Sequence, residues 1–355
     1  LLGTDWHIDQ MKWAMNESAP LDLKLGPRKY LYGTNEYLYV DPYQENDDNV
    51  LPLKKMMEDF NAGKFSLEVG NGIFMEYVPA RQFSIPVNKE NILKHGILDA
   101  KYADQIPDKI VLTIPKDKQY LTKPEIFMLD LLSNYQWDRP INFLSMGGDI
   151  NVGIKEYLMY EGFSYKFVPI KNKMKSTEIG FADPEDLYYK MKNVFSWDAL
   201  KRTDWYVDYQ NYYTFCGVLS QRSTFVNVAK EMMKIGDTER AIEMLDMCQE
   251  CVPVENFPLD LSYLGFSNEY MVIDMIETYY IAGAADKAIA LARSFVDELF
   301  VSMNFFLEYY DIAKKEFESC YNCVSYIADV TEHFGDKEFA DEIIERFNKM
   351  VDFEE

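Results

Sequence analysis

The chain has 355 residues, of which 48% are hydrophobic and 27% charged, so it is long enough for two domains and apolar enough to bury their cores. Its formal net charge of -23 repels phosphate backbones and anionic lipid headgroups, which excludes nucleic-acid binding. The acidity is concentrated late: 23 basic residues stand against 29 acidic ones up to residue 200, and 13 against 30 after it. Basic or neutral partners are compatible with this net charge. The alternative is that the excess of acidic residues only keeps the protein soluble.

No stretch approaches the roughly 18 consecutive apolar residues that cross a bilayer, and no secretion signal opens the chain. The first residue is Leu1 rather than Met, so we expect a chain that is either processed or cut from something longer, which leaves room for an anchor upstream. Five cysteines at low density do not indicate a disulfide framework, so the fold must rest on its core.

Helical and strand patterns alternate over the first part of the chain, which predicts an α/β (or α+β) module over residues 1–200. A short helix is expected over 5–15, and the stretch 20–52, rich in Tyr, Gly, Pro and Asp, is typical of loop. Helices are expected over 51–60, 88–95, 100–106, 123–135 and 152–160, and strands over 66–69, 73–78, 83–87, 109–114, 141–144 and 164–168. The helix over 123–135 has the clearest signals, since Thr122 precedes it and Pro124 lies in its first turn.

After Trp205 only helical periodicity remains, which predicts an all-α region of tetratricopeptide-like helical hairpins over residues 201–355. Three segments share one plan: 225–253, 272–300 and 324–352. The first fits the tetratricopeptide spacing closely, with small residues where two helices approach and Gly236 at the turn. The turn glycines Gly236, Gly283 and Gly335 are 47 and 52 residues apart, rather than about 34, so longer helices or inserted loops are expected. Such hairpins either bind a peptide or only pack together.

Two C-x-x-C pairs are weak candidates for a zinc site, formed by Cys248, Cys251, Cys320 and Cys323. Cys248 fills a packing position of the first hairpin, no knuckle glycine follows either pair, and helical hairpins separate them. Buried thiols are therefore the preferred interpretation. We expect no metal and no cofactor.

Other chemical motifs are weak. The acidic run with Asp41, Glu45, Asp47 and Asp48 lacks the pattern of a calcium loop, and a solvated loop explains it. Gly147-Gly148-Asp149 follows a predicted strand but matches no phosphate-binding fingerprint, so a tight turn explains it equally well. No catalytic residue is singled out.

Two groups of residues are candidates for interaction rather than chemistry. One is Asp5, Trp6 and His7 near the start of the chain. The other is Trp137 and Arg139, at the turn before a predicted strand. Aromatic and charged loop residues often make contacts with partners, although ordinary packing and capping explain them as well.

Four stretches together resemble a known family: 4–12 (TDWHIDQMK), 83–87 (FSIPV), 128–143 (MLDLLSNYQWDRPINF) and 157–170 (YLMYEGFSYKFVPI). They are similar to the soluble C-terminal region of the DUF2723 family, bacterial membrane proteins that resemble protein O-mannosyltransferases. In that family a multi-spanning N-terminal region precedes a soluble region that ends in helical repeats.

The resemblance implies that the glycosyl-transfer machinery lies in a missing upstream membrane domain, so this fragment is not catalytic alone. It implies an accessory domain on the extracytoplasmic (periplasmic) face, which positions acceptor protein through its repeats or stabilises its own membrane domain. Two other hypotheses remain open. One is a free-standing tetratricopeptide-like scaffold for protein partners, and the other is an α/β enzyme with an unrecognised site.

Overall fold

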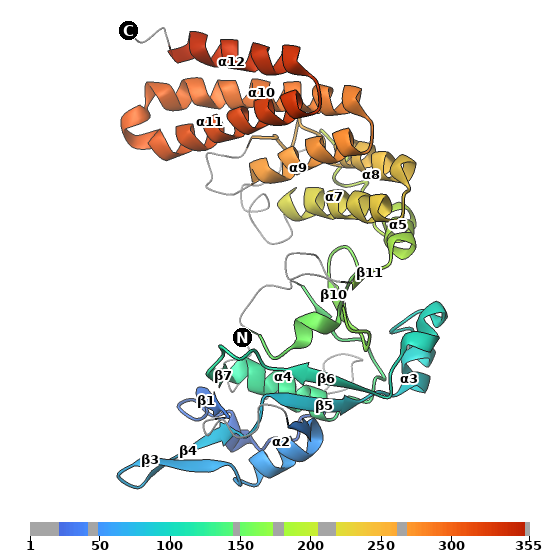
Figure 1. Cartoon of the computed structure of the whole chain (residues 1–355), viewed down its shortest axis with the longest axis vertical. Coiled ribbons are helices and arrows are strands. Elements are labelled where there is room, and N and C mark those ends of the chain that lie inside the picture. The colour runs from blue at the N-terminus through green and yellow to red at the C-terminus, as the bar shows by residue number, and fades with distance from the viewer. Residues whose placement is uncertain are drawn as a thin grey trace. The chain divides into compact units, whose positions relative to one another are not determined.

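A computed structural model describes residues 21–41, 49–144, 150–172, 181–204, 218–260 and 268–351 (Figure 1). The chain forms two compact units, Leu1–Ala182 and Asp183–Glu355. The first is a mixed α/β region with three small sheets, and the second is all helical, so the predicted fold class is confirmed. The division lies at residue 182, whereas the change in composition suggested a boundary near 200.

The first unit contains three 3-10 helices, three α-helices and eleven strands within its described residues. The helices are η1 (Pro27–Lys29), α2 (Leu53–Asn61), α3 (Lys89–Lys94), η2 (Ala100–Gln105), α4 (Lys123–Ser133) and η3 (Ile154–Tyr157). The strands are β1 (Tyr37–Val40), β2 (Val50–Pro52), β3 (Ser66–Gly70), β4 (Ile73–Val78), β5 (Gln82–Pro86), β6 (Lys109–Thr113), β7 (Tyr120–Thr122), β8 (Asn142–Phe143), β9 (Leu158–Tyr160), β10 (Tyr165–Phe167) and β11 (Phe181–Ala182).

Helix α4 lies at the centre of this unit, and nine of its eleven residues are buried. Its start is fixed by a capping box, in which Glu125 accepts a hydrogen bond from the backbone N–H of Thr122 (2.9 Å). The other carboxylate oxygen of Glu125 accepts from Asn151 N (2.7 Å) and lies 2.9 Å from Lys118 Nζ. Farther along, the buried Asp130 accepts from the backbone N–H groups of Lys24 and Leu25, both at 3.0 Å. The helix therefore satisfies its buried carboxylates with neighbouring chain segments.

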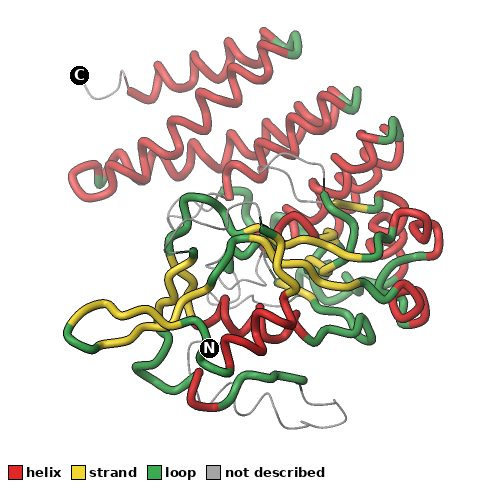
Figure 2. The backbone as a smooth tube through the Cα atoms, turned by 60° about the horizontal axis from the view of Figure 1, so that its bottom comes forward, coloured by secondary structure: helices red, strands yellow, loops and turns green. Residues whose placement is uncertain are grey.

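The first sheet has the order β3-β4-β1-β7. Strand β1 pairs in parallel with β4 and antiparallel with β7, so two partners distant in sequence flank it. Figure 2 shows the β3–β4 hairpin extending away from the other strands. One face of this sheet enters the core through Leu38, Val40, Val78 and Leu121, each at most 3% exposed. Strand β1 lies within the stretch 20–52 that was predicted to be loop, and β7 ends just before the predicted helix over 123–135. Neither strand was predicted, because each is only three or four residues long.

The second sheet has the order β2-β5-β6, which leaves β6 at an edge. The segment after α4 covers this edge. Gly153, at φ +84°, lies against the backbone of Thr113, and the Tyr157 hydroxyl accepts from Val111 N (3.3 Å) and donates to Val111 O (3.0 Å). The helix predicted over 152–160 is therefore wrong: only one 3-10 turn forms, and Leu158–Tyr160 continue as β9, because these contacts hold the segment extended.

The third sheet has the order β11-β9-β10-β8, with every residue of β9 buried. The expected strands over 66–69, 73–78, 83–87, 109–114 and 164–168 are confirmed as β3, β4, β5, β6 and β10. The helix predicted over 5–15 and the turn at Gly147-Gly148 lie outside the described residues.

The second unit begins with α5 (Pro184–Asn193) and continues with helical hairpins, which stack side by side in Figure 1. The hairpins are α7 (Val218–Lys234) with α8 (Thr238–Cys251), α9 (Asn268–Ile281) with α10 (Ala285–Glu308), and α11 (Tyr310–His333) with α12 (Lys337–Val351). The three predicted turn glycines all have positive φ, at 81°, 84° and 98°. The spacing of 52 residues between Gly283 and Gly335 is explained by α10 and α11, which are 24 residues long each. Between Gly236 and Gly283, the helices α8 and α9 have 14 residues each, and the 16 residues 252–267 separate them.

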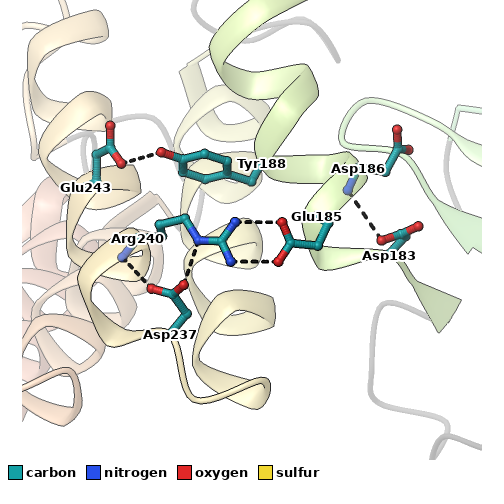
Figure 3. A network of polar contacts seen from close by, with 7 residues as sticks. All are labelled: Asp183, Glu185, Asp186, Tyr188, Asp237, Arg240 and Glu243. Carbon is teal, nitrogen blue, oxygen red and sulfur yellow. Dashed lines mark hydrogen bonds and ion pairs between the residues drawn. The ribbon is translucent and has the colours of Figure 1, made fainter.

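Helix α5 joins this unit through a polar network on α8 (Figure 3). Arg240 donates two hydrogen bonds to Glu185 (2.6 and 2.7 Å), and its Nε donates to Asp237 (2.6 Å). Asp237 also caps α8 by accepting from Arg240 N (2.9 Å). Beyond α5, Trp197 packs on Phe225 of α7, with ring centroids 4.6 Å apart. Residues 183–204 therefore belong with the hairpins, in agreement with the division at 182.

Candidate functional site

The turn between α4 and β8 encloses a hollow of about 630 Å3. Charged and amide side chains line part of it, namely Asp22, Asn134, Gln136, Asp138 and Arg139. The remaining lining comes from Leu21, Leu131, Tyr135, Pro140 and Ile141. A mixed lining of this kind suits a small polar group or a peptide side chain. Its charged and amide groups can hold a polar ligand by hydrogen bonds and ion pairs.

Trp137 holds the turn in place from inside. Its ring is fully buried and stacks on Phe167, with centroids 5.4 Å apart and planes at 12°. The indole N–H donates to Pro86 O (2.9 Å). The backbone of Trp137 has φ +57°, a left-handed conformation that is rare for a bulky residue and that the surrounding packing must impose. Trp137 can therefore affect a partner only by positioning the turn.

Arg139 lies at the hollow and is half-buried. Its carbonyl accepts a hydrogen bond from the Tyr135 hydroxyl (2.6 Å), which closes the turn. Burial raises the pKa of Tyr135, the Asp138 charge raises it further, and the Arg139 charge opposes the rise. The hydroxyl therefore stays protonated and keeps donating at physiological pH. Of the two residues predicted here, Arg139 reaches the hollow and Trp137 supports it.

A second hollow of about 670 Å3 runs along the outer side of β6. Lys109 and Lys171 line it together with Gln82, Thr113 and Tyr157. Lys171 is paired with Glu156 (2.8 Å), so the hollow does not present two free cations. Sequence patterns do not reveal this hollow, because its lining comes from separate parts of the chain: Gln82, 105–113, Tyr157 and 169–171.

Asp5, Trp6 and His7 lie outside the described residues, as do Glu45, Asp47 and Asp48. Asp41 is buried, and its backbone N–H donates to Val78 O (2.7 Å). Among the residues that the structure describes, no three His, Cys, Asp or Glu side chains meet in a way that could hold a metal ion.

The four cysteines of the C-x-x-C pairs are buried free thiols. Cys248 and Cys251 lie in α8, and Cys320 and Cys323 lie in α11. Burial raises the pKa of Cys248 to about 12 and that of Cys251 to about 11. Both thiols are therefore protonated at neutral pH, which makes them poor nucleophiles.

Residues 1–186 match the family described as TMEM260-associated domain 2. The chain belongs to this family. The TMEM260-associated domain covers the whole α/β unit, including the hollow at Arg139, and reaches the first turn of α5. No curated protein and no solved structure matches the chain. Within the described part of the chain, no helix combines the length and apolar character that a membrane span requires.

Proposed function

We propose that the chain is an accessory region of a membrane-bound glycosyltransferase that resembles the protein O-mannosyltransferases. It lies on the extracytoplasmic face of the membrane, is anchored by an upstream multi-spanning region, and holds acceptor protein near the membrane domain or stabilises that domain. The observation that carries the proposal is the match of residues 1–186 to a domain associated with TMEM260. The sequence resemblance at residues 128–143, which form α4 and the Arg139 turn, supports it.

The character of the described hollows also supports an accessory role. The hollow at Arg139 is lined by charged and amide side chains that are suited to binding. Cys248 and Cys251 are protonated. The buried carboxylates of the first unit, Glu125 and Asp130, are occupied by structural hydrogen bonds. These residues stabilise the fold, so we assign the binding of partners to residues at the surface.

Acceptor protein is recognised by the helical hairpins, which we regard as tetratricopeptide-like. The junction of α10 and α11, a tip formed by the last two turns of α10 and the start of α11, exposes large apolar side chains, with Val301 at 72%, Phe305 at 57% and Ile312 at 84% exposure. Tyr309 packs beside Phe305, with ring centroids 5.0 Å apart. Clustered exposed apolar residues commonly mark a protein-binding surface. The same feature favours the second candidate, a free-standing scaffold for protein partners.

The size and location of the native product separate these two functions. Source cells are fractionated beside markers for soluble and integral membrane proteins, and peptides of this chain are followed by mass spectrometry. We expect a membrane-bound product far heavier than 41.6 kDa. A soluble product of about that mass would contradict the glycosyltransferase proposal and leave the scaffold.

A second experiment tests the recognition of acceptor. Phe305→Ser together with Ile312→Ser is introduced into the full native gene, and O-glycosylation of cellular proteins is measured by glycopeptide mass spectrometry. We expect lower glycosylation at an unchanged level of the product. The matched control is Ile235→Ser, an exposed apolar residue at the α7–α8 turn, which should leave glycosylation unchanged. Equal glycosylation in the double variant and the native protein would exclude acceptor binding at this tip.

A further inference from the structure

Four aromatic residues stand in register across the first sheet. Tyr39 of β1 lies opposite Tyr77 of β4 on one side and Tyr120 of β7 on the other. Phe65, next to β3, receives a backbone hydrogen bond from Tyr77 N (3.2 Å) and extends the row to the fourth strand. Adjacent strands lie about 4.8 Å apart, so the row is about 14 Å long. Paired residues of neighbouring strands point to the same face, so these side chains form one aromatic row.

The exposed part of the row is Tyr39 and Tyr120, whereas Phe65 is partly buried against the hydrophobic core. Along β1, Leu38 and Val40 are buried while Tyr37 and Tyr39 are 61% and 47% exposed. Tyr120 is 46% exposed, and its ring meets that of Tyr37 edge to face at 5.0 Å. At the other end the rings of Phe65 and Tyr77 lie 5.9 Å apart. Three half-exposed tyrosines on one short stretch of sheet are more aromatic surface than solubility favours, and they leave rings available to a partner.

The outer face is also uncharged. The charged residues of the four strands are Glu68 and Glu76, and strand alternation places both on the opposite side from the row. Glu76 is in addition paired with Lys29. In a chain with a net charge of -23, a neutral aromatic surface selects against cationic and anionic partners alike, since neither gains an ion pair there.

We infer that this face binds neutral oligosaccharides, whose sugar rings stack on the aromatic row. Tyrosine offers a flat apolar face for the C–H side of a sugar and a hydroxyl for its polar edge. The spacing of neighbouring strands is close to the length of one sugar ring, so two successive rings of a linear glycan can lie on Tyr39 and Tyr120. This binding is independent of the proposed glycosyltransferase role, because it needs only the sheet.

The test is calorimetric titration of the chain with neutral tetrasaccharides of mannose, glucose, galactose and N-acetylglucosamine. We expect saturable binding of at least one of them. Tyr39→Leu and Tyr120→Leu keep apolar bulk but remove the ring, and each should weaken binding about tenfold. Tyr39→Phe keeps the ring and should bind nearly as the native chain does. Tyr189→Leu, an equally exposed tyrosine of α5, is the matched control and should change nothing.

Circular dichroism and melting curves show whether each variant is folded before titration. Absence of saturable binding to every tetrasaccharide would overturn the inference. So would unchanged binding in both Leu variants, which would place any sugar site elsewhere. Binding of phosphatidylcholine vesicles or of an unglycosylated peptide through Tyr39 and Tyr120, without sugar binding, would assign the face to another partner. Membrane location of the native product does not affect these results.

Discussion

The backbone of Gly153 lies so close to that of Thr113 that a Cβ on residue 153 would come within 2.5 Å of Thr113 N and 2.8 Å of Thr113 O. Gly153 also has φ +84°, which side chains disfavour. Gly153→Ala should therefore force apart β6 and the segment that covers it, and lower the free energy of unfolding by about 3 kcal/mol or more. Urea unfolding measures this change.

Gly96→Ala is the matched control for that substitution. Gly96 has φ +63° but no atom within 4 Å of an added Cβ, so only the backbone conformation is penalised, by about 1 kcal/mol. A similar loss of stability in the two variants would mean that the contact with Thr113 has no role.

The second and third hairpins are joined by Tyr280, whose ring is stacked on that of Phe334 at 4.7 Å with planes at 2°. Its hydroxyl donates to Asp336 (2.7 Å). Tyr280→Phe removes only the hydroxyl and should lower stability by about 1 kcal/mol, whereas Tyr280→Ala also removes the stack and should cost about 3 kcal/mol or more. Tyr270→Phe, at an exposed position of α9, should have little effect in the same thermal unfolding series.

The carboxyl group of Glu298 makes the stability of the folded protein depend on pH, in a direction that its pKa determines. Burial raises the pKa of this carboxyl above its ordinary value of 4.5, against the lowering effect of the N–H groups of Asp260 and Leu259. Because the folded state holds the proton more tightly than the unfolded state, the stability from this group is complete below pH 4.5 and is lost as the pH rises through the folded-state pKa.

Glu298→Gln should remove this decline. Leu259 N and Asp260 N donate to the same oxygen, at 2.7 and 3.0 Å, and an amide oxygen can accept both bonds. Urea unfolding between about pH 4 and pH 7 should therefore show the variant gaining stability relative to the native chain as the pH rises. Glu298→Ala leaves both donors without this acceptor and should be destabilising throughout, by about 1 to 3 kcal/mol. A constant difference between the Gln variant and the native chain at all pH values would contradict this account.

Cys248 and Cys251 should react slowly with alkylating reagents in the folded protein. Their burial and raised pKa leave almost no thiolate at pH 8. Mass spectrometry of the peptides that contain them should show little labelling in buffer and full labelling in urea, and added zinc should not change the rate. Rapid labelling of native Cys248, or protection by zinc, would revive the metal hypothesis.

The hairpins were predictable from the sequence because their signals are local. Apolar residues recur at helical spacing, and Gly236, Gly283 and Gly335 mark turns at which only a small residue fits easily. Strand β1 was not predictable, because it is stabilised by pairing with β4 and β7, which lie far along the chain. The same applies to β9, where Gly153 and Tyr157 act through contacts with β6 that no periodicity reveals.

The candidate sites also differ in how far the sequence alone could predict them. Trp137 and Arg139 are close in sequence, so their turn could be singled out, but their division into a buried support and a residue at the hollow required the fold. The aromatic row combines residues of β1, β4 and β7 with Phe65 beside β3, and Tyr39 and Tyr120 are brought together only by pairing. A sequence rich in tyrosine indicates such surfaces in general without placing them.

The cover on β6 also bears on how the protein behaves at high concentration. An uncovered edge strand offers backbone donors and acceptors to another molecule and is a common start of aggregation. Here the Tyr157 hydroxyl occupies both groups of Val111, and Gly153 blocks access to Thr113. A substitution that loosens this segment should thus expose the edge of the sheet to pairing between molecules. The same substitution should therefore lower both the stability and the solubility of the protein.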